Sequence, residues 1–350
     1  VNNGTIIADG GALNIVPIAN QGRLNGTGTL RIDGGALSLG TGEATNQGTL
    51  DMRATGTLAL GTQNLVLSSD YTNVQAGSGN AFNRRAGVSG TGQIQAGGDV
   101  QQVISGASVT GGNTANATLT IGNVRVGVNQ FDYTIGNGGT TGPTLRGAVQ
   151  TNVNGANLTD ARLSGSGVTA SNYNAGAPAG SGETRTVTFV ASGAGALAPM
   201  SGQVLNLHST YDNIADQKLN IVMASGAAAY NAAVGSTVSP MQVANQRVNG
   251  TSTAVLNISN TASPGNFSED LDATIASTGG QATDAIINAI TRGQDQNGNG
   301  IALLAQLAQH IQATDAGQVQ VQKQKVVDLG SQLLQGAFAF LEPINRVALV

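Results

Sequence analysis

The chain contains no cysteine and no tryptophan, and only 10% of its 350 residues are charged and 3% aromatic. The lack of cysteine excludes a disulfide framework, a zinc–thiolate site and a cysteine nucleophile. Soluble chains average about 25% charged residues, so this chain is poor in charge. Its net charge of -4 and sequence pI of about 5.0 argue against a nucleic-acid-binding protein. No run reaches about 18 apolar residues, so we expect no membrane-spanning helix.

Glycine and small apolar residues dominate instead. The chain has 51 glycines and is 40% hydrophobic, which with the low net charge excludes a typical disordered chain. The glycines follow no three-residue period, which excludes collagen. The opening residues 1–4 do not form a signal peptide, so we expect any export signal to have been removed or to lie outside this sequence.

Three similar stretches near the start predict a repeat. Each has an Asn-x-Gly turn, an apolar–polar alternation, a second turn and a short second strand. The stretches begin at Asn2-Asn3-Gly4-Thr5-Ile6, Asn20-Gln21-Gly22-Arg23-Leu24 and Asn46-Gln47-Gly48-Thr49-Leu50, and their second strands are Leu13-Asn14-Ile15, Leu37-Ser38-Leu39 and Leu58-Ala59-Leu60. A spacing of about 18–26 residues is typical of one solenoid coil. We therefore predict a β-solenoid over residues 1–99, with a β-meander of hairpins as the alternative.

The first repeat begins at the first residues of the chain. A solenoid coil cannot bury its own open face, and native solenoids cap their ends. We therefore expect either that the chain is a piece of a longer protein or that another copy covers that face.

Residues 100–222 have the pattern of an antiparallel β-sandwich. Apolar–polar alternation recurs in short runs separated by Gly, Asn, Ser and Pro clusters. The predicted strands are residues 117–121, 130–135, 145–151, 185–191, 202–208 and 218–224. The fold class we predict is thus all-β, with an N-terminal solenoid and Ig-like β-sandwich modules.

Short sequences from the first part of the predicted sandwich recur about 122 residues later in the chain. Residues 121–126 match 243–248, and residues 133–137 match 256–260. We therefore predict a second Ig-like module over residues 223–350. Apolar residues at helical spacing favour a helical hairpin inserted near 282–314, although strands as in the first module are the alternative.

The last fifteen residues, 336–350, are unusually apolar. Their large apolar side chains are Phe338, Phe340, Leu341, Val347 and Leu349. An uncovered strand of this kind is an aggregation hazard, so we expect it to pair with another strand. We therefore predict that this assembly strand is donated to a neighbouring copy.

Distinctive short sequences occur at residues 64–71, 79–85, 211–217, 244–248 and 260–262. Together they resemble the bacterial choice-of-anchor D surface proteins, and the resemblance covers roughly residues 50–275. Such proteins look like autotransporter-style passengers joined to Ig-like modules of the Hydin type. The resemblance implies an exported, cell-surface or extracellular protein of a Gram-negative bacterium, and it transfers no catalytic motif.

One segment matches the start of an EF-hand-like calcium loop. Its oxygen ligands would be Asp295, Asn297 and Asn299, followed by Gly300 at the sharp turn. Position 12 is Gln306 in place of the bidentate glutamate, so we expect affinity of only about millimolar. The alternative is a hydrophilic turn, and apart from this calcium candidate we predict no cofactor.

Carboxylate pairs are the other candidates for chemistry. Asp9 and Asp33 occupy equivalent turn positions and could stack, as a polysaccharide hydrolase or lyase would need. Asp before Gly-Gly is also ordinary turn chemistry, and tryptophan platforms for sugars are absent. Residues 269–272 carry three carboxylates, which we interpret as a solvated face.

The basic residues and histidines carry weaker signals. Arg84-Arg85 is interpreted as a salt-bridging or solvated turn rather than an anion site. His208 and His310 are the only histidines, too few for a three-histidine metal site. We therefore predict no enzyme.

The predicted function is that of an extracellular structural protein that assembles head to tail with copies of itself into a filament or layer. The alternative is an adhesin passenger fragment that binds a glycan or cell surface.

Overall fold

The computed structural model describes residues 1–14, 24–39 and 45–237, and the shorter stretches 252–253, 257–262, 265–271, 290–291, 302–303, 308–309, 312–314 and 318–320. The chain divides into two compact units, Val1–Ala232 and Ala233–Val350. Strands dominate, and the helical turns among the described residues are η1 (Gly79–Ala81) and η2 (Ser166–Val168). The all-β prediction is confirmed. Within the described ranges, no helix is long and apolar enough to span a membrane.

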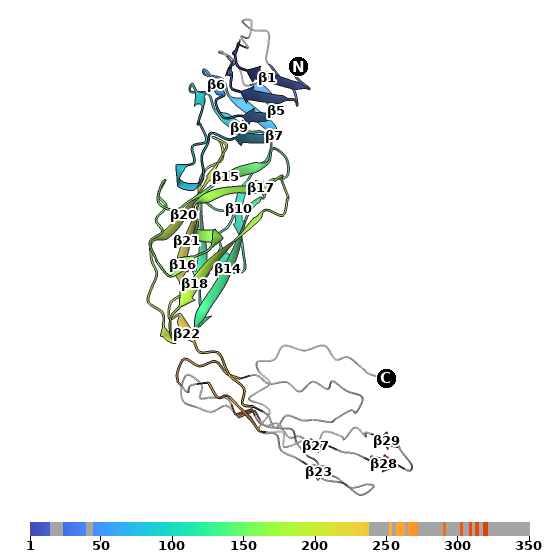
Figure 1. Cartoon of the computed structure of the whole chain (residues 1–350), viewed down its shortest axis with the longest axis vertical. Helices are drawn as coiled ribbons and strands as arrows, with labels where there is room; N and C mark the ends of the chain where they lie inside the picture. Colours follow the sequence, from blue (N-terminus) through green and yellow to red (C-terminus); the bar gives the residue numbers. More distant parts are fainter. Residues whose placement is uncertain are drawn as a thin grey trace. The chain divides into compact units, whose positions relative to one another are not determined.

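The first part of the Val1–Ala232 unit consists of two parallel sheets, which we call the parallel region (Figure 1). The chain passes from one sheet to the other and back, so that odd-numbered and even-numbered strands alternate. The first sheet has the order β1 (Thr5–Asp9), β3 (Thr29–Asp33), β5 (Thr45–Met52), β7 (Leu65–Asn73) and β9 (Ile94–Ala96). The second has the order β2 (Ala12–Asn14), β4 (Ala36–Ser38), β6 (Thr57–Ala59) and β8 (Val88–Ser89).

Aligned apolar side chains form the core of the parallel region. In the first sheet Ile6, Leu30, Leu50 and Tyr71 are in register. In the second sheet Leu13, Leu37, Leu58 and Val88 are in register, which confirms the predicted alignment of the three second strands. Alternation at period 2 places all of these side chains on the inner faces.

The predicted alignment of the second repeat is wrong. Thr29 aligns with Thr5 and Thr49, so Gly28 takes the place that the pattern assigned to Gly22. Both glycines lie two residues before a leucine. Only Gly28 is followed by a full alternation, with Leu30 and then Ile32 turned into the core. The apolar pattern thus outweighs the turn signal.

The rest of this unit is built from two larger sheets, which we call the two-sheet region. The first has the order β10 (Gln102–Ser105), β14 (Gly127–Asn137), β18 (Glu183–Ala191) and β16 (Leu163–Ser164). The second has the order β11 (Val109–Thr110), β12 (Asn116–Ile121), β21 (Gln217–Met223), β20 (Gln203–Ser209), β15 (Leu145–Gln150) and β17 (Ser171–Gly176). A small sheet of β13 (Val124–Arg125), β22 (Ala228–Tyr230) and β19 (Gly195–Ala196) completes it.

All six strands predicted in this region are confirmed, as β12, β14, β15, β18, β20 and β21. Two pairings differ from the antiparallel prediction, because β12 runs parallel to β21 and β13 runs parallel to β22. Apolar–polar alternation determines on which face of the sheet a side chain lies. It carries no information on whether a distant partner strand runs parallel or antiparallel. Fully buried Tyr133, Phe189 and Leu207 come from both large sheets and join one core with the parallel region.

The Ala233–Val350 unit is described in short stretches. Its strands are β23 (Ser252–Thr253), β24 (Ile258–Ser259), β25 (Ile290–Thr291), β26 (Ala302–Leu303), β27 (Ala308–Gln309), β28 (Gln312–Thr314) and β29 (Gln318–Gln320). The described residues of the range 282–314 are therefore in strands and not in the helical hairpin expected there. The other residues of that hairpin lie outside the described part of the chain.

Candidate functional site

The edge strand β9 of the parallel region is capped by a loop of the two-sheet region. The backbone N–H of Asp212 donates to the carbonyl of Ile94 at 2.8 Å, and the Asp212 carboxylate accepts from the N–H of Ile94 at 2.9 Å. The Asn213 side chain accepts from the N–H of Ala96 at 2.8 Å and donates to its carbonyl at 2.9 Å. These bonds replace the next strand, so the β9 edge is closed within the chain.

Two arginines hold the Asp212 carboxylate in place. Arg84 Nε lies 3.2 Å from Oδ1, and Arg85 Nη1 lies 3.0 Å from Oδ2. The Asp212 side chain is only 10% exposed, so the two arginines neutralise a carboxylate charge that is largely shielded from water. The prediction that Arg84-Arg85 forms salt bridges is confirmed.

A second ion pair joins the two regions. Arg146 binds Asp70 with both guanidinium arms, from Nε to Oδ1 at 2.9 Å and from Nη2 to Oδ2 at 3.0 Å. The hydrogen bond to Asp70 raises the pKa of Arg146 above its usual range. Close by, the backbone N–H of Thr144 donates to the carbonyl of Ser69 at 2.7 Å. Two-armed pairing fixes orientation as well as distance, so the two regions are held as one body.

At the opposite edge of the parallel region, strand β1 pairs only with β3 within the described ranges. Ile7 on the outward face of β1 is 51% exposed. Ile6 and Leu13, at this end of the core columns, are half-buried, while their neighbours Leu30 and Leu37 are fully buried.

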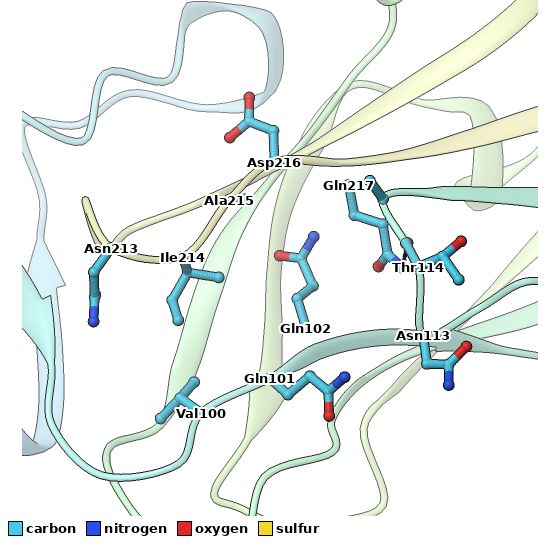
Figure 2. A pocket seen from close by; sticks show the side chains of 11 residues that line it. Val100, Gln101, Gln102, Asn113, Thr114, Asn213, Ile214, Ala215, Asp216 and Gln217 are labelled. Atoms are coloured by element: carbon cyan, nitrogen blue, oxygen red, sulfur yellow. Dashed lines mark hydrogen bonds between the residues drawn. The ribbon is translucent and has the colours of Figure 1, made fainter.

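A polar cavity of about 280 Å³ lies beside the β9 cap (Figure 2). Its side chains come from three segments, residues 100–102, 113–115 and 213–217. Gln217 is 3% exposed, and its Nε2 donates to the carbonyls of Gly112 and Thr114, both at 2.7 Å. Its Oε1 has no hydrogen-bond partner. Gln217 thus lines the cavity with a side chain whose orientation is set by the two donated bonds and whose acceptor oxygen is itself buried.

The neighbouring polar groups are paired. Gln102 accepts from the Tyr173 hydroxyl and donates to the carbonyl of Leu207. Asp216 accepts from Asn206 at 2.9 Å and lies 2.7 Å from His208 Nδ1. Burial opposes the charged form of Asp216, but the bonds to His208 and Asn206 outweigh it and lower the pKa of this carboxyl.

The structure describes the predicted carboxylate pair, Asp9 and Asp33, but not the predicted calcium loop. Asp9 and Asp33 are in register, as predicted, and Asp33 forms an ion pair with Arg31. Among the residues that the structure describes, no group of three or more His, Asp and Glu could hold a metal ion. The calcium candidates Asp295, Asn297 and Asn299, and the assembly strand 336–350, lie outside the described residues.

The sequence did not predict the roles of Asp212, Asn213 and Gln217. Their signal was present, since Asp212, Asn213 and Asp216 come shortly before strand β21 and Gln217 begins it. Comparisons of the chain with protein-family models, curated proteins and solved structures found no match.

Proposed function

We propose that this chain is a non-enzymatic structural subunit that assembles outside a bacterial cell into a filament or surface layer. Copies join head to tail, and the apolar strand 336–350 of one copy is donated to a sheet edge of the next. The observation that carries the proposal is the difference between the two ends of the parallel sheet. The β9 edge is closed by Asp212 and Asn213, whereas β1 pairs only with β3 among the described residues. A sheet edge without a second partner strand favours pairing with another chain.

The architecture that we propose for this role is a β-solenoid followed by two Ig-like modules. Parallel strands that alternate between two sheets support the solenoid. Two stacked sheets with a shared core support the first Ig-like module. The repeat of residues 133–137 at 256–260 supports the second.

The link between the parallel and two-sheet regions suits a subunit that transmits load. Asp70–Arg146 and the Arg84–Arg85–Asp212 cluster connect residues far apart in sequence. Partly buried two-armed pairs resist bending better than a flexible linker, because each bond has a required orientation. A rod of rigid units would extend without folding back.

The proposal is tested by electron microscopy and analytical ultracentrifugation of the full chain and of a variant lacking residues 336–350. We expect regular polymers from the full chain and a folded monomer from the deletion, with circular dichroism as the control for folding. Polymers that survive the deletion would exclude strand donation by 336–350. A full chain that remains monomeric at all concentrations would exclude the structural-subunit function.

The polar cavity favours a second candidate, an adhesin passenger fragment that binds a glycan. Gln101 and Asn113 line the cavity with exposed carboxamides, and carboxamides can hydrogen-bond sugar hydroxyls. NMR titration of the ¹⁵N-labelled chain with glucose, galactose and N-acetylglucosamine tests this candidate. Saturable shifts of the Gln101 and Asn113 side-chain amides would support it, and unchanged spectra with all three sugars would remove it.

A further inference from the structure

We propose that the two-sheet region bears tension, and that the parallel pairs β12–β21 and β13–β22 form a clamp that is loaded in shear when the chain is pulled across these strands. The inference goes beyond self-assembly, because it concerns what a single copy does under force. It rests on the direction of the paired strands, on additional hydrogen bonds between them and on the burial of their apolar side chains.

The clamp joins an early segment of the two-sheet region to its last segment. β12 pairs with β21 in parallel over six register positions, beginning with Asn116 and Lys218. β13 and β22 continue the parallel pairing further along both segments. Tension pulls the N-terminal end of β12 and the C-terminal end of β22 apart. Because the strands run parallel, these pulls act in opposite directions along the strands, which must slide before they separate.

Sliding is resisted because the hydrogen bonds share the load. The ladder bonds of a parallel pair are evenly spaced along the strands, so sliding strains all of them together. If both pulled ends lay at the same end of the pair, the bonds would instead open one at a time from that end. Forced unfolding is governed by the rate of unfolding, so a shared load lets the region withstand a higher force.

Side chains of the last segment add hydrogen bonds to the start of the clamp. Gln217 Nε2 donates to the carbonyls of Gly112 and Thr114, both at 2.7 Å, just before β12. Asn220 Nδ2 donates to the carbonyl of Ala117 at 3.1 Å, within β12. These bonds hold the start of β12 at positions that sliding would displace.

The far end of the clamp is held in the same way. The Asn123 Oδ1, between β12 and β13, accepts from the backbone N–H of Ala228 at 3.1 Å. The N–H of Val126, directly after β13, donates to the carbonyl of Tyr230 at 2.8 Å. Bonds beyond the ladder therefore occur at both ends of the paired segments, which opposes fraying from either end.

Apolar side chains shield one face of the ladder. Ala117 and Leu119 on β12, and Leu219 and Ile221 on β21, are fully buried. These four residues form two register pairs across the ladder. Water is excluded on this face, so a strained ladder bond is not readily exchanged for a bond to solvent.

Single-molecule force spectroscopy of the full chain tests the clamp, because the chain has no native cysteine and can be held at chosen positions. Ala115→Cys with Ser225→Cys, both exposed positions, pulls at opposite ends of the β12–β21 pair and loads it in shear. Gly122→Cys with Ser225→Cys pulls at one end of the pair and unzips it. A Cβ on Gly122 meets no atom within 4 Å, so this cysteine fits. We expect a several-fold higher rupture force in shear.

A matched pair of substitutions tests the additional hydrogen bonds. Asn220→Ala removes the bond to Ala117 across the clamp and should lower the rupture force in shear. Asn157→Ala removes a bond of the same kind outside the clamp, from Nδ2 to the carbonyl of Gly202 at 3.0 Å, and should leave that force unchanged. Circular dichroism checks that each variant is folded. If Ala115→Cys does not fold, the exposed neighbour Asn113→Cys gives the same shear geometry.

Equal rupture forces in the two pulling geometries would overturn the clamp and leave the proposal of self-assembly standing. A chain that forms no polymers but resists shear would overturn the proposed function and support the clamp. If Asn157→Ala lowers the rupture force as much as Asn220→Ala, the role of the additional hydrogen bonds is overturned.

Discussion

Asn137 and Asn260 make the same set of hydrogen bonds in the two units of the chain. The Asn137 Oδ1 accepts from the backbone N–H of Gly139 and of Gln101, at 3.2 and 3.3 Å. The Asn260 Oδ1 accepts from the N–H of Ala262 and of Val234, both at 3.0 Å. In each case the first bond is to the residue two positions after the asparagine, and the second is to a residue outside a strand earlier in the chain.

The remaining bonds match as well. The residue after each asparagine donates its N–H to the carbonyl of the same earlier residue, from Gly138 to Gln101 and from Thr261 to Val234. Each Nδ2 donates to a carbonyl further along, that of Pro143 or Glu269. The sequence match of 133–137 with 256–260 places these two asparagines at equivalent positions, and their hydrogen bonds agree with that match.

Replacing Asn137 by alanine should destabilise the Val1–Ala232 unit. Asn137 is almost fully buried, and its loss leaves the N–H groups of Gln101 and Gly139 without an acceptor. Only the bond to Gly139 is fully buried, so at about 1–3 kcal/mol for one unsatisfied buried group we expect a loss of roughly 1–3 kcal/mol in the free energy of unfolding. Urea unfolding measures it. Asn137→Asp keeps the acceptor and is the control, expected to lose less; an alanine variant as stable as the unmodified chain would contradict this role.

The alternation of apolar and polar residues along the sequence was enough to predict most strands, but it did not predict how the strands pair. Six strands of the two-sheet region follow from apolar–polar periodicity, because each buries one face. The parallel pairing of β12 with β21 has no local signal, and neither has the ion pair between Asp70 and Arg146, which lie 76 residues apart. In the parallel region Gly22 carries the Asn-x-Gly turn signal and Gly28 does not, yet packing of Leu30 and Ile32 in the core places Gly28 at the repeat position.

The candidate sites were less predictable for the same reason. The β9 cap brings Asp212 against Ile94, and the cavity acceptor Gln217 is oriented by Gly112 and Thr114. A sequence shows which side chains are polar, but the contacts that make a carboxylate a cap or leave an amide oxygen unpaired arise only when distant segments meet.

The Asp70–Arg146 pair should couple the parallel and two-sheet regions. We expect a double-mutant cycle of Asp70→Ala and Arg146→Ala to give a coupling free energy of about 1–2 kcal/mol, because the pair is two-armed and only partly exposed. Arg146→Lys should lose much of it, since lysine cannot bind both carboxylate oxygens in the same fork. The pair Arg53–Asp51 within the parallel region, more exposed at its arginine, is the comparison and should couple more weakly. Equal coupling for both pairs would argue against a special role for Asp70.

Asp212→Ala should open the β9 edge. The substitution removes the acceptor of the Ile94 N–H and leaves Arg84 and Arg85 without their carboxylate. Removing one partner of a buried ion pair costs about 3–5 kcal/mol, so a loss near the lower figure is expected with partly exposed arginines. Hydrogen exchange should show faster exchange at Ile94 and Ala96 than at Leu30 in the inner strand β3. Unchanged protection at Ile94 would mean that the loop does not cap this edge.

Acid should destabilise the two-sheet region through Asp216. Its pKa is lowered in the folded chain, because hydrogen bonds from His208 and Asn206 outweigh the effect of burial. A lowered folded pKa means that the unfolded chain binds more protons between that value and the ordinary aspartate pKa of about 3.9. The stability from this group is therefore fully present above about pH 4 and is lost as the pH falls through the folded pKa.

Urea unfolding of the unmodified chain and of Asp216→Asn, measured between about pH 2 and pH 6, tests this effect. The free energy of unfolding of the unmodified chain should fall more steeply with acid than that of Asp216→Asn, which has no carboxyl to protonate. Asp160→Asn should reduce the slope in the same direction, because the hydrogen bond from Arg162 lowers the pKa of Asp160. If Asp216→Asn loses stability equally at every pH, the side chain acts through its hydrogen bonds alone, and its ionisation does not contribute to acid unfolding.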